Sequence, residues 1–450
     1  MTVRRLMVCA LVLLMGACKG SDAIDKAVVS TDSAAVDART DAAFAPLAEQ
    51  YVKLVLAVGQ HDGGYVDAYY GPAEWQDQAK QQKMSLDSIG SHAARLLMQV
   101  NAIDIQSASV LVQLRKAFLT KQLESLQAYS RMLQGEKMKF DDESRALYNA
   151  VAPTYPESHF ASMLDSLSTL LPGEGTVAQR LEAYKRDFII PKEKLDTVFR
   201  AAIAEGRRRT AAHVTLPANE SFVLEFVADK PWSGYNWYKG KASSLIQINT
   251  ELPIYIERAI DVGAHEGYPG HHVYNALLEQ NLVNGRKWPE YSVYPLFSPM
   301  SLIAEGSANY GIDVAFPGAE RVAFERDVLY PLAGLDPARA EEYARVRALA
   351  DRMSYAGNEA ARAYLNGDIT ADSAAHWLTT YALMEPARAK QRIKFFDTYR
   401  SYVINYNYGR DMVGRYVESH GGTASDPEKR WSVFKELLSS PRLPSDLVSK

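Results

Sequence analysis

The sequence predicts a mainly α-helical protein that carries one small β-sheet, and three observations support this. Apolar residues recur at steps of three and four between residues 111 and 133, which is the period of an amphipathic helix. Residues 221–227 alternate instead with a period of two, which predicts a strand. The 450-residue chain is 47% hydrophobic and 23% charged, so it can bury a large core.

Helix-start signals and the same periodicity predict the other elements. Thr370 and Pro386 stand at positions typical of a helix N-cap and a first helical residue. Further helices are expected at about residues 160–172, 176–186, 192–208, 318–331, 336–365, 370–383 and 385–400. A second strand is expected over residues 244–250, and the aromatic segment 231–238 between the strands is expected to form a turn.

The N-terminus has the features of a lipoprotein signal peptide. A basic start precedes an apolar run, residues 6–15, that is too short to span a bilayer. The run leads into Leu-Met-Gly-Ala-Cys, which resembles a bacterial lipobox ending at Cys18. We expect residues 1–17 to be removed, Cys18 to carry lipid, and residues 18–42, rich in Ala, Asp and Ser, to form a flexible tether. An ordinary signal peptide is the alternative.

The expected location is the bacterial cell envelope. Lys19 follows the lipidated cysteine in place of the Asp that retains lipoproteins at the inner membrane. This favours an anchor in the outer membrane, with the protein facing the periplasm. The membrane is thus an expected partner, reached through the lipid on Cys18.

Cysteine content and charge exclude several function classes. The chain has two cysteines, Cys9 and Cys18, and neither would leave a free thiol in the mature domain. Disulfides, thiolate catalysis and cysteine-ligated metals are therefore excluded. The net charge of −4, with scattered basic residues, argues against a nucleic-acid partner.

Residues 265–272 carry the strongest functional signal. They read His-Glu-Gly-Tyr-Pro-Gly-His-His and hold three of the nine histidines. Imidazoles and a carboxylate at this density are typical of a Zn²⁺ site, and a Glu after the first His is where metallohydrolases keep a general base. On an expected helix over about 254–268, however, the residue four after His265 is Pro269. An unbroken helix would place the later histidines about 9–10 Å above His265.

The Pro269-Gly270 pair offers a way to close that distance. Proline interrupts a helix and glycine permits unusual backbone conformations, so together they can form a two-residue bulge. We expect the bulge to return His271 to the metal and to leave His272 outside the ligand set, although His272 remains an alternative ligand. Glu266 would face a bound water and accept its proton.

A third ligand is expected on a second helix, which begins near residue 298 or 299. Glu305 is the candidate, and the small residues Gly306 and Ala308 would allow that helix to approach the first. Asn309, one turn on, could hydrogen-bond a ligating imidazole. The residues thus predict one Zn²⁺ per chain; histidines in a polar loop and a surface carboxylate are the plain alternatives.

These residues resemble the uncharacterised bacterial family DUF885. Its signature is His-Glu-x-x-Pro-Gly-His-His followed by Glu-Gly-Trp-Ala-x-Tyr, and the resemblance covers about residues 45–420. It implies a helical domain over 43–450, with an active-site core at 220–420 and a layout similar to gluzincin and M32 peptidases. It also implies metal ligands at His265, His271 and Glu305, with Glu266 as the base.

The family pattern also implies a tyrosine that stabilises the oxyanion of a tetrahedral intermediate. Tyr406 fits the Tyr-x-x-Gly part of that pattern. Residues 400–403 depart from the Pro-Gly-Gln-Ala that precedes it in the family, so Tyr408 and Tyr310 remain alternatives. Ser307 stands where the family has Trp, which alters the pocket wall.

The strand before the site helix has a further expected role. In peptidases of similar layout an edge strand pairs with the extended substrate, which would put Asn249 and Thr250 at the rim of the site. A purely structural strand is the alternative.

The sequence therefore predicts a lipid-anchored zinc hydrolase, a metallopeptidase that acts on small peptides. One alternative is a metal-dependent hydrolase of a non-peptide amide or ester. The other is a non-catalytic envelope protein that keeps a relic or binding metal site. Glu266 argues against the relic, because a structural metal site needs no base.

Overall fold

The structure is a computed structural model that describes residues 31–230 and 232–448. The expected signal peptide, the lipidation site Cys18 and residues 18–30 of the expected tether lie outside the described residues. No helix within the described ranges is long and apolar enough to cross a membrane.

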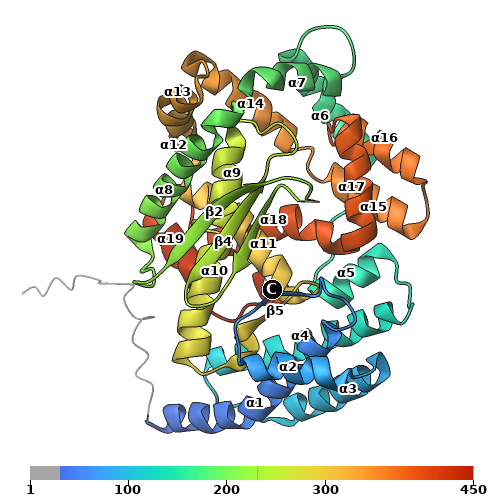
Figure 1. The fold of residues 1–450 in the computed structure, drawn as a ribbon, viewed down its shortest axis with the longest axis vertical. Helices are drawn as coiled ribbons and strands as arrows, with labels where there is room; N and C mark the ends of the chain where they lie inside the picture. Colours follow the sequence, from blue (N-terminus) through green and yellow to red (C-terminus); the bar gives the residue numbers. More distant parts are fainter. Residues whose placement is uncertain (1–30, 231, 449–450) are drawn as a thin grey trace, which may run out of the picture.

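Helices make up most of the described chain, which confirms the predicted fold class (Figure 1). The first helices are α1 (Thr31–Val58), α2 (Ala73–Gln82), α3 (Leu86–Ala102), α4 (Val110–Leu133), α5 (Phe140–Tyr148) and α6 (Glu157–Leu170). They are followed by α7 (Val177–Lys185), α8 (Leu195–His213), α9 (Glu257–Glu266), α10 (His271–Leu278) and α11 (Pro299–Ala315). The C-terminal helices are α12 (Gly318–Phe324), α13 (Tyr330–Ala333), α14 (Ala340–Asp351), α15 (Ala356–Asn366), α16 (Ala371–Tyr381), α17 (Pro386–Tyr399), α18 (Ile404–Ser419) and α19 (Pro427–Leu438). Every expected helix occurs, and the long ones expected at 318–331 and 336–365 are each divided.

The first helix corrects the expected tether. Residues 31–42 are helical, because α1 begins at Thr31. The backbone N–H of Ser109 donates to Asp37, and Asp41 pairs with the buried Arg115 of α4 at 2.8 Å. An alanine-rich composition suits a helix as well as a tether, and these two contacts fix the helix.

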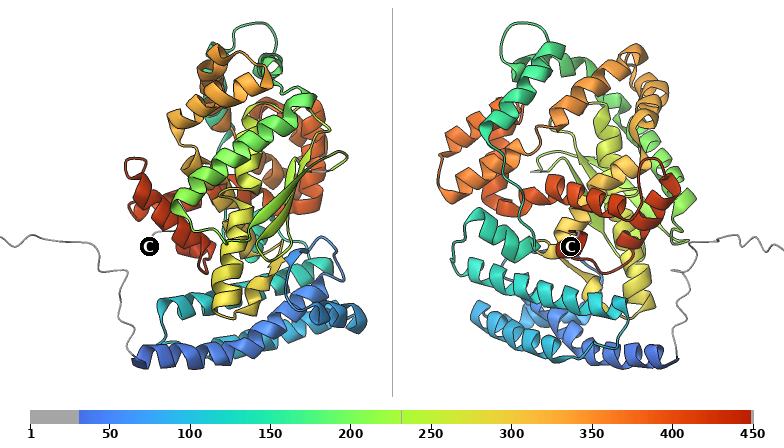
Figure 2. Two further views of the ribbon diagram at one scale, coloured as in Figure 1. Left: turned by 60° about the vertical axis from the view of Figure 1, so that its left-hand side comes forward. Right: turned by 180° about the vertical axis from the view of Figure 1, so that it is seen from behind.

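The helices are arranged in three groups, one at each end of the molecule and one in the middle. Figure 2 shows α1, α3 and α4 side by side at one end, and these helices are in contact. Helices α6, α7 and α14 lie at the other end, and α9, α10, α11 and α18 lie between (Figure 1). One continuous hydrophobic core reaches from Phe44 on α1 to Leu447 near the end of the described chain.

A small sheet packs against the site helices α9 and α10, as predicted, but it has three strands in place of the expected two. It consists of β2 (Ser221–Val227), β4 (Ser243–Asn249) and β3 (Gly234–Tyr238), in that order. Strand β4 is parallel to β2 and antiparallel to β3. The aromatic segment expected to be a turn is therefore mostly an edge strand, since its bulky aromatic residues suit a pleated sheet.

A second, two-stranded sheet was not expected. Strand β1 (Val66–Tyr69) pairs antiparallel with β5 (Val293–Pro295), far away in the sequence. The register shifts between Val66 and Ala68, so Asp67 sits in an irregular position. Such irregularities redirect a side chain, and here the pairing brings the N-terminal region to the wall of the central cavity.

Candidate metal centre

The turn between α9 and α10 forms as the Pro269-Gly270 pair predicts. Helix α9 ends at Glu266, and α10 begins at His271. The N–H of Gly270 donates to the carbonyl of Ala264 at 2.9 Å, which folds the chain back. A Cβ at residue 270 would lie 1.8 Å from the carbonyl oxygen of His265, so only glycine fits there.

This turn brings two imidazoles together, and α11 adds a carboxylate. The rings of His265 and His271 have centroids 4.6 Å apart and planes at 90°. One donor atom from each of His265, His271 and Glu305 lies within 4.8 Å of the others. The structure therefore brings the three predicted ligands together.

The three donor atoms lie close together, and their contacts with one another leave one carboxylate oxygen without a hydrogen bond. His265 Nε2 lies 3.1 Å from Glu305 Oε2, and His271 Nε2 lies 3.7 Å from Oε1. Glu305 Oε2 is nevertheless buried without a hydrogen bond, so the 3.1 Å contact lacks hydrogen-bond geometry. Two imidazoles and one carboxylate are a known ligand set for Zn²⁺, and an unsatisfied buried oxygen is what such an ion would fill.

Asn309 hydrogen-bonds an imidazole, as predicted. Its Oδ1 lies 3.2 Å from Nδ1 of His265, and its Nδ2 donates to the carbonyl of Tyr406 at 3.2 Å. This pairing assigns the proton of His265 to Nδ1 and leaves Nε2 free to act as a ligand.

Gly306 allows a close helix approach, but its partner is α18, not α9. A Cβ at Gly306 would lie 2.5 Å from the backbone of Gly409. The two glycines let α11 and α18 touch, which places Glu305 beside the start of α18. Helices α9 and α11 are in contact, as expected, but Gly306 faces α18 and does not make that contact.

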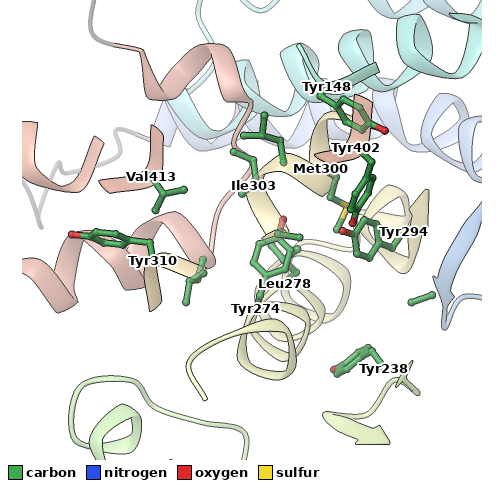
Figure 3. Packing of buried hydrophobic residues seen from close by; sticks show 14 of the residues in the cluster. Tyr148, Tyr238, Tyr274, Leu278, Tyr294, Met300, Ile303, Tyr310, Tyr402 and Val413 are labelled. Carbon is green, nitrogen blue, oxygen red and sulfur yellow. The ribbon is translucent and has the colours of Figure 1, made fainter. Parts of the chain in front are cut away.

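Tyr402 and Tyr406 line the cavity beside Glu305, and of these only Tyr406 was expected. The hydroxyl of Tyr402 donates to Glu305 Oε1 at 2.8 Å. Tyr406, one turn further, also lines the cavity. Burial raises the pKa of both phenols well above its ordinary value, and the charge of Glu305 raises it further, so both keep their protons. Figure 3 shows Tyr402 in the core between Tyr148 and Tyr294.

The alternative tyrosines lie outside the cavity wall. The hydroxyl of Tyr310 accepts a hydrogen bond from Arg430, and Tyr408 lies under the guanidinium of Arg415. Neither lines the cavity. Of the tyrosines named from the sequence, Tyr406 alone is placed to meet a substrate.

His272 points away from Glu305 into a second polar cluster. Its Nδ1 lies 2.8 Å from Ser244 Oγ, and its Nε2 lies 3.0 Å from Glu220 Oε2. Glu220 also accepts from the hydroxyl of Tyr268 and pairs with Arg207 at 2.6 Å. We call these five residues the Glu220 clamp. The structure thus separates His272 from the three predicted ligands, as expected from the Pro269-Gly270 bulge.

The clamp holds an ionised carboxylate in the interior. Burial alone would raise the pKa of Glu220, but hydrogen bonds from His272, Tyr268 and Arg207 outweigh it and lower the pKa to about 2. The clamp therefore fastens Tyr268 and His272, which flank the turn that carries His271.

Glu266 is free to act beside the predicted ligands. It is buried, it lines the cavity, and its carboxylate makes no hydrogen bond with the residues of 31–230 and 232–448. A Cβ at Gly234 would lie 3.1 Å from Glu266 Oε1, so the carboxylate lies against strand β3. Burial raises its pKa, while the nearby imidazoles of His265 and His271 oppose that rise.

Asp67 is a site residue that sequence reasoning missed. It lines the cavity and accepts a hydrogen bond from the hydroxyl of Tyr235. Burial raises its pKa to about 6, against the lowering effects of Tyr235 and His271. No motif surrounds it, and only the pairing of β1 with β5 brings it here. The cavity wall thus extends beyond the expected core at 220–420, and Leu181 and Lys185 also contribute.

The expected rim residues do not present a free strand edge. Asn249 lines the cavity, but its amide donates to the carbonyls of Lys230 and Trp232. Thr250 donates to the carbonyl of Val227 and does not line the cavity. Asn249 ends β4 and Thr250 follows it, and β4 is the central strand, so both of its edges are already paired.

The edge strand beside the site is β3. The two residues that flank β3 bond to β4: Asn249 N–H donates to Ser233 O, and Lys239 N–H donates to Ser243 O. With the alternation of an antiparallel pair, the backbone groups of Gly234 and Asn236 then point away from β4. Both residues line the cavity, and the Asn236 side chain donates to the carbonyl of Glu266 at 2.5 Å.

Comparison with known proteins identifies a shared fold. No protein-family profile matches the chain, and no curated protein matches it in sequence. A solved structure from Colwellia psychrerythraea, provisionally named a lipoprotein, shares 14% identity, covering 82% of this chain and 70% of that one, with a TM-score of 0.51. An M32 carboxypeptidase from Deinococcus radiodurans R1 shares 14% identity, covering 89% and 90%, with a TM-score of 0.43. The first likeness shows the fold alone, and the second is too distant to carry an argument.

Proposed function

We propose that the protein is a zinc-dependent hydrolase that cleaves small peptides at the bacterial cell envelope. One observation carries the proposal: the donors of His265, His271 and Glu305 converge beside Glu266, a carboxylate without a hydrogen-bond partner in the described chain. A structural metal site has no use for such a carboxylate. The arrangement therefore favours catalysis over a relic or a purely binding site.

The residues divide the reaction between them. A bound Zn²⁺ would polarise the scissile carbonyl and lower the pKa of the attacking water. Glu266, whose pKa is raised by burial, accepts the proton that this water gives up. Tyr406 keeps its own proton and donates a hydrogen bond to the carbonyl oxygen as negative charge develops there. Tyr402 holds Glu305, and Asn309 holds His265, so neither ligand has to reorient.

The edge of β3 favours a peptide over an ester. An extended peptide can add to a free strand edge through its own N–H and C=O groups, and an ester lacks the N–H. Gly234 and Asn236 offer such an edge beside Glu266. The expected partner strand β4 is thus replaced in this role by β3.

We place the protein at the envelope through a lipid on Cys18, in the outer membrane and facing the periplasm. The lipobox-like run before Cys18 supports the anchor. The Colwellia protein, which shares the fold, carries the name of a lipoprotein. The motif from His265 to His272 supports membership of the family DUF885.

A substrate panel tests the function. The mature chain is stripped of metal, restored with zinc and assayed on short peptides and on esters of matched side chains. We expect zinc to restore cleavage of the peptides and Glu266→Gln to abolish it. Cleavage of esters alone would replace the peptidase with the non-peptide hydrolase, and no turnover by zinc-loaded protein would favour the relic.

A further inference from the structure

Arg392 on α17 is a cation without a partner in the wall of the cavity. It lines the cavity, and it makes no hydrogen bond or ion pair with any residue that the structure describes. Its Nε is buried and unsatisfied. The guanidinium carbon lies 4.3 Å from the ring centroid of Phe395 and 5.5 Å from that of Phe396. A guanidinium has five N–H donors, and leaving them unmatched away from bulk water is costly.

The other basic side chains of the cavity wall are occupied. Arg321 pairs with Asp261 at 2.6 Å, and Arg410 pairs with Asp313 at 2.7 Å. Three more have their own partners: Lys185 with Glu257, Arg258 with Ser233 and Arg388 with the carbonyl of Pro253. The wall is therefore not generally basic. Among the Lys and Arg side chains of the wall, Arg392 alone has neither a hydrogen bond nor an ion pair within the described ranges, so it is free to bind a ligand group with one negative charge.

Arg392 lies close to the predicted reaction centre. Phe395, which its guanidinium covers, has its ring centroid 6.4 Å from that of Tyr406. Burial and the charge of Glu305 raise the pKa of Tyr406, and the charge of Arg392 acts against them. Tyr406 is therefore influenced by the charges of both Arg392 and Glu305. A ligand group on Arg392 would be attached to a bond within reach of Tyr406.

We propose that Arg392 binds a carboxylate of the substrate. This inference rests on the proposed function and narrows its substrates to peptides that carry a carboxylate near the cleaved bond. A planar guanidinium matches a planar carboxylate through two parallel N–H···O bonds, and stacking on Phe395 holds the plane in place. The carboxylate can belong to the peptide's C-terminus or to an acidic side chain.

Binding of three probes tests the inference without turnover. The probes are N-acetyl-alanyl-glutaminyl-alanine as the free acid, its C-terminal amide, and the amide in which glutamate replaces glutamine. Calorimetry with the zinc-supplemented Glu266→Gln protein measures each dissociation constant. We expect at least one carboxylate probe to bind about 10- to 100-fold more tightly than the neutral amide. A tighter free acid identifies the C-terminal carboxylate, and a tighter glutamate probe identifies a side-chain carboxylate.

Variants of α17 assign that preference to Arg392. Added to the Glu266→Gln background, Arg392→Gln is expected to abolish the preference. Lys390→Gln, which removes an exposed charge from the same helix, is expected to leave it unchanged. Arg392→Lys keeps a charge but loses the paired donors, so most of the preference should disappear even if Arg392→Gln does not fold.

Several results would overturn the inference. These are equal binding of all three probes, no binding of any of them, or a preference that survives in both Arg392 variants. The proposed function fails separately. If zinc-dependent cleavage occurs without a carboxylate preference, the proposed hydrolase function stands and the Arg392 site is refuted. If binding depends on Arg392 but no hydrolysis occurs, the Arg392 site stands and the hydrolase function is refuted.

Discussion

His271 and His272 are neighbours in sequence, yet they belong to two regions that differ in how fully their polar groups are hydrogen-bonded. His271 joins His265 and Glu305, where one carboxylate oxygen is buried without a hydrogen bond. His272 joins the Glu220 clamp, where both of its ring nitrogens have partners within 3.0 Å. Both regions contain histidine and glutamate. The two regions differ in their hydrogen bonding and not in their residue types, because the candidate metal centre contains a buried carboxylate oxygen without a hydrogen bond.

The two regions also depend on each other. The clamp holds the residues on either side of the Pro269–His271 turn, and hydrogen bonds to a charged group contribute about 1.5–3 kcal/mol each. We infer that the clamp keeps His271 aimed at Glu305. Substitutions on the two sides should therefore separate activity from stability.

The largest expected effect is on the metal side, in Glu266→Gln. The amide cannot accept a proton, so turnover on a cleaved peptide should fall by about 10²- to 10⁴-fold. Metal content should not change, because Glu266 is not among the three converging donors. Steady-state kinetics and metal analysis measure both, with the exposed Glu251→Gln as control. Full activity in Glu266→Gln would show that the base is wrongly assigned.

Tyr406→Phe should have the next largest effect on activity. Loss of an oxyanion donor costs about 10²- to 10³-fold in kcat, with little change in KM. Tyr408→Phe and Tyr310→Phe should retain normal kcat, since neither phenol lines the cavity. An equal loss of kcat in all three variants would contradict the assignment of Tyr406.

On the clamp side, His272→Ala should reduce stability more than activity per folded molecule. It leaves Glu220 and Ser244 buried with lost partners, at a cost of about 2–4 kcal/mol in the free energy of unfolding. Urea denaturation measures this cost. An unchanged free energy of unfolding would contradict the clamp.

The smallest effect concerns pH. The pKa of Glu220 is lowered to about 2, below the ordinary value of about 4.3. Its contribution to stability is therefore present above about pH 4.5 and is lost as the pH falls towards 2. Between pH 5 and pH 2, the free energy of unfolding of the wild type should fall by on the order of 2 kcal/mol more than that of Glu220→Gln. Parallel stability curves from pH 5 to pH 2 would argue against an ionised Glu220 in the fold.

Local sequence predicted one region better than the other. Proline and glycine at 269 and 270 act within their own turn, so the approach of His271 to His265 could be derived from spacing alone. The spacing of Asn309 from Glu305 likewise predicted its contact with His265.

The clamp and the added cavity residues depend on distant contacts. Glu220 directly precedes β2, and the folding of the sheet against α10 brings it to His272. Asp67 lines the cavity only because β1 pairs with β5. Neither pairing leaves a local pattern. Tyr402 did leave one, since it precedes Tyr406 by a helical turn and so shares its face. The aromatic segment that the sequence predicts as a turn is mostly strand β3, and its register with β4 is continuous from Gly234 to Tyr238.

The most direct test is the zinc content of the mature chain beside His271→Ala and His272→Ala. The central claim is that His265, His271 and Glu305 hold the metal and that His272 does not. We expect about one zinc per folded chain in the wild type and in His272→Ala, and none in His271→Ala. No zinc in the wild type after zinc is added, or zinc lost from His272→Ala and kept by His271→Ala, would contradict the account.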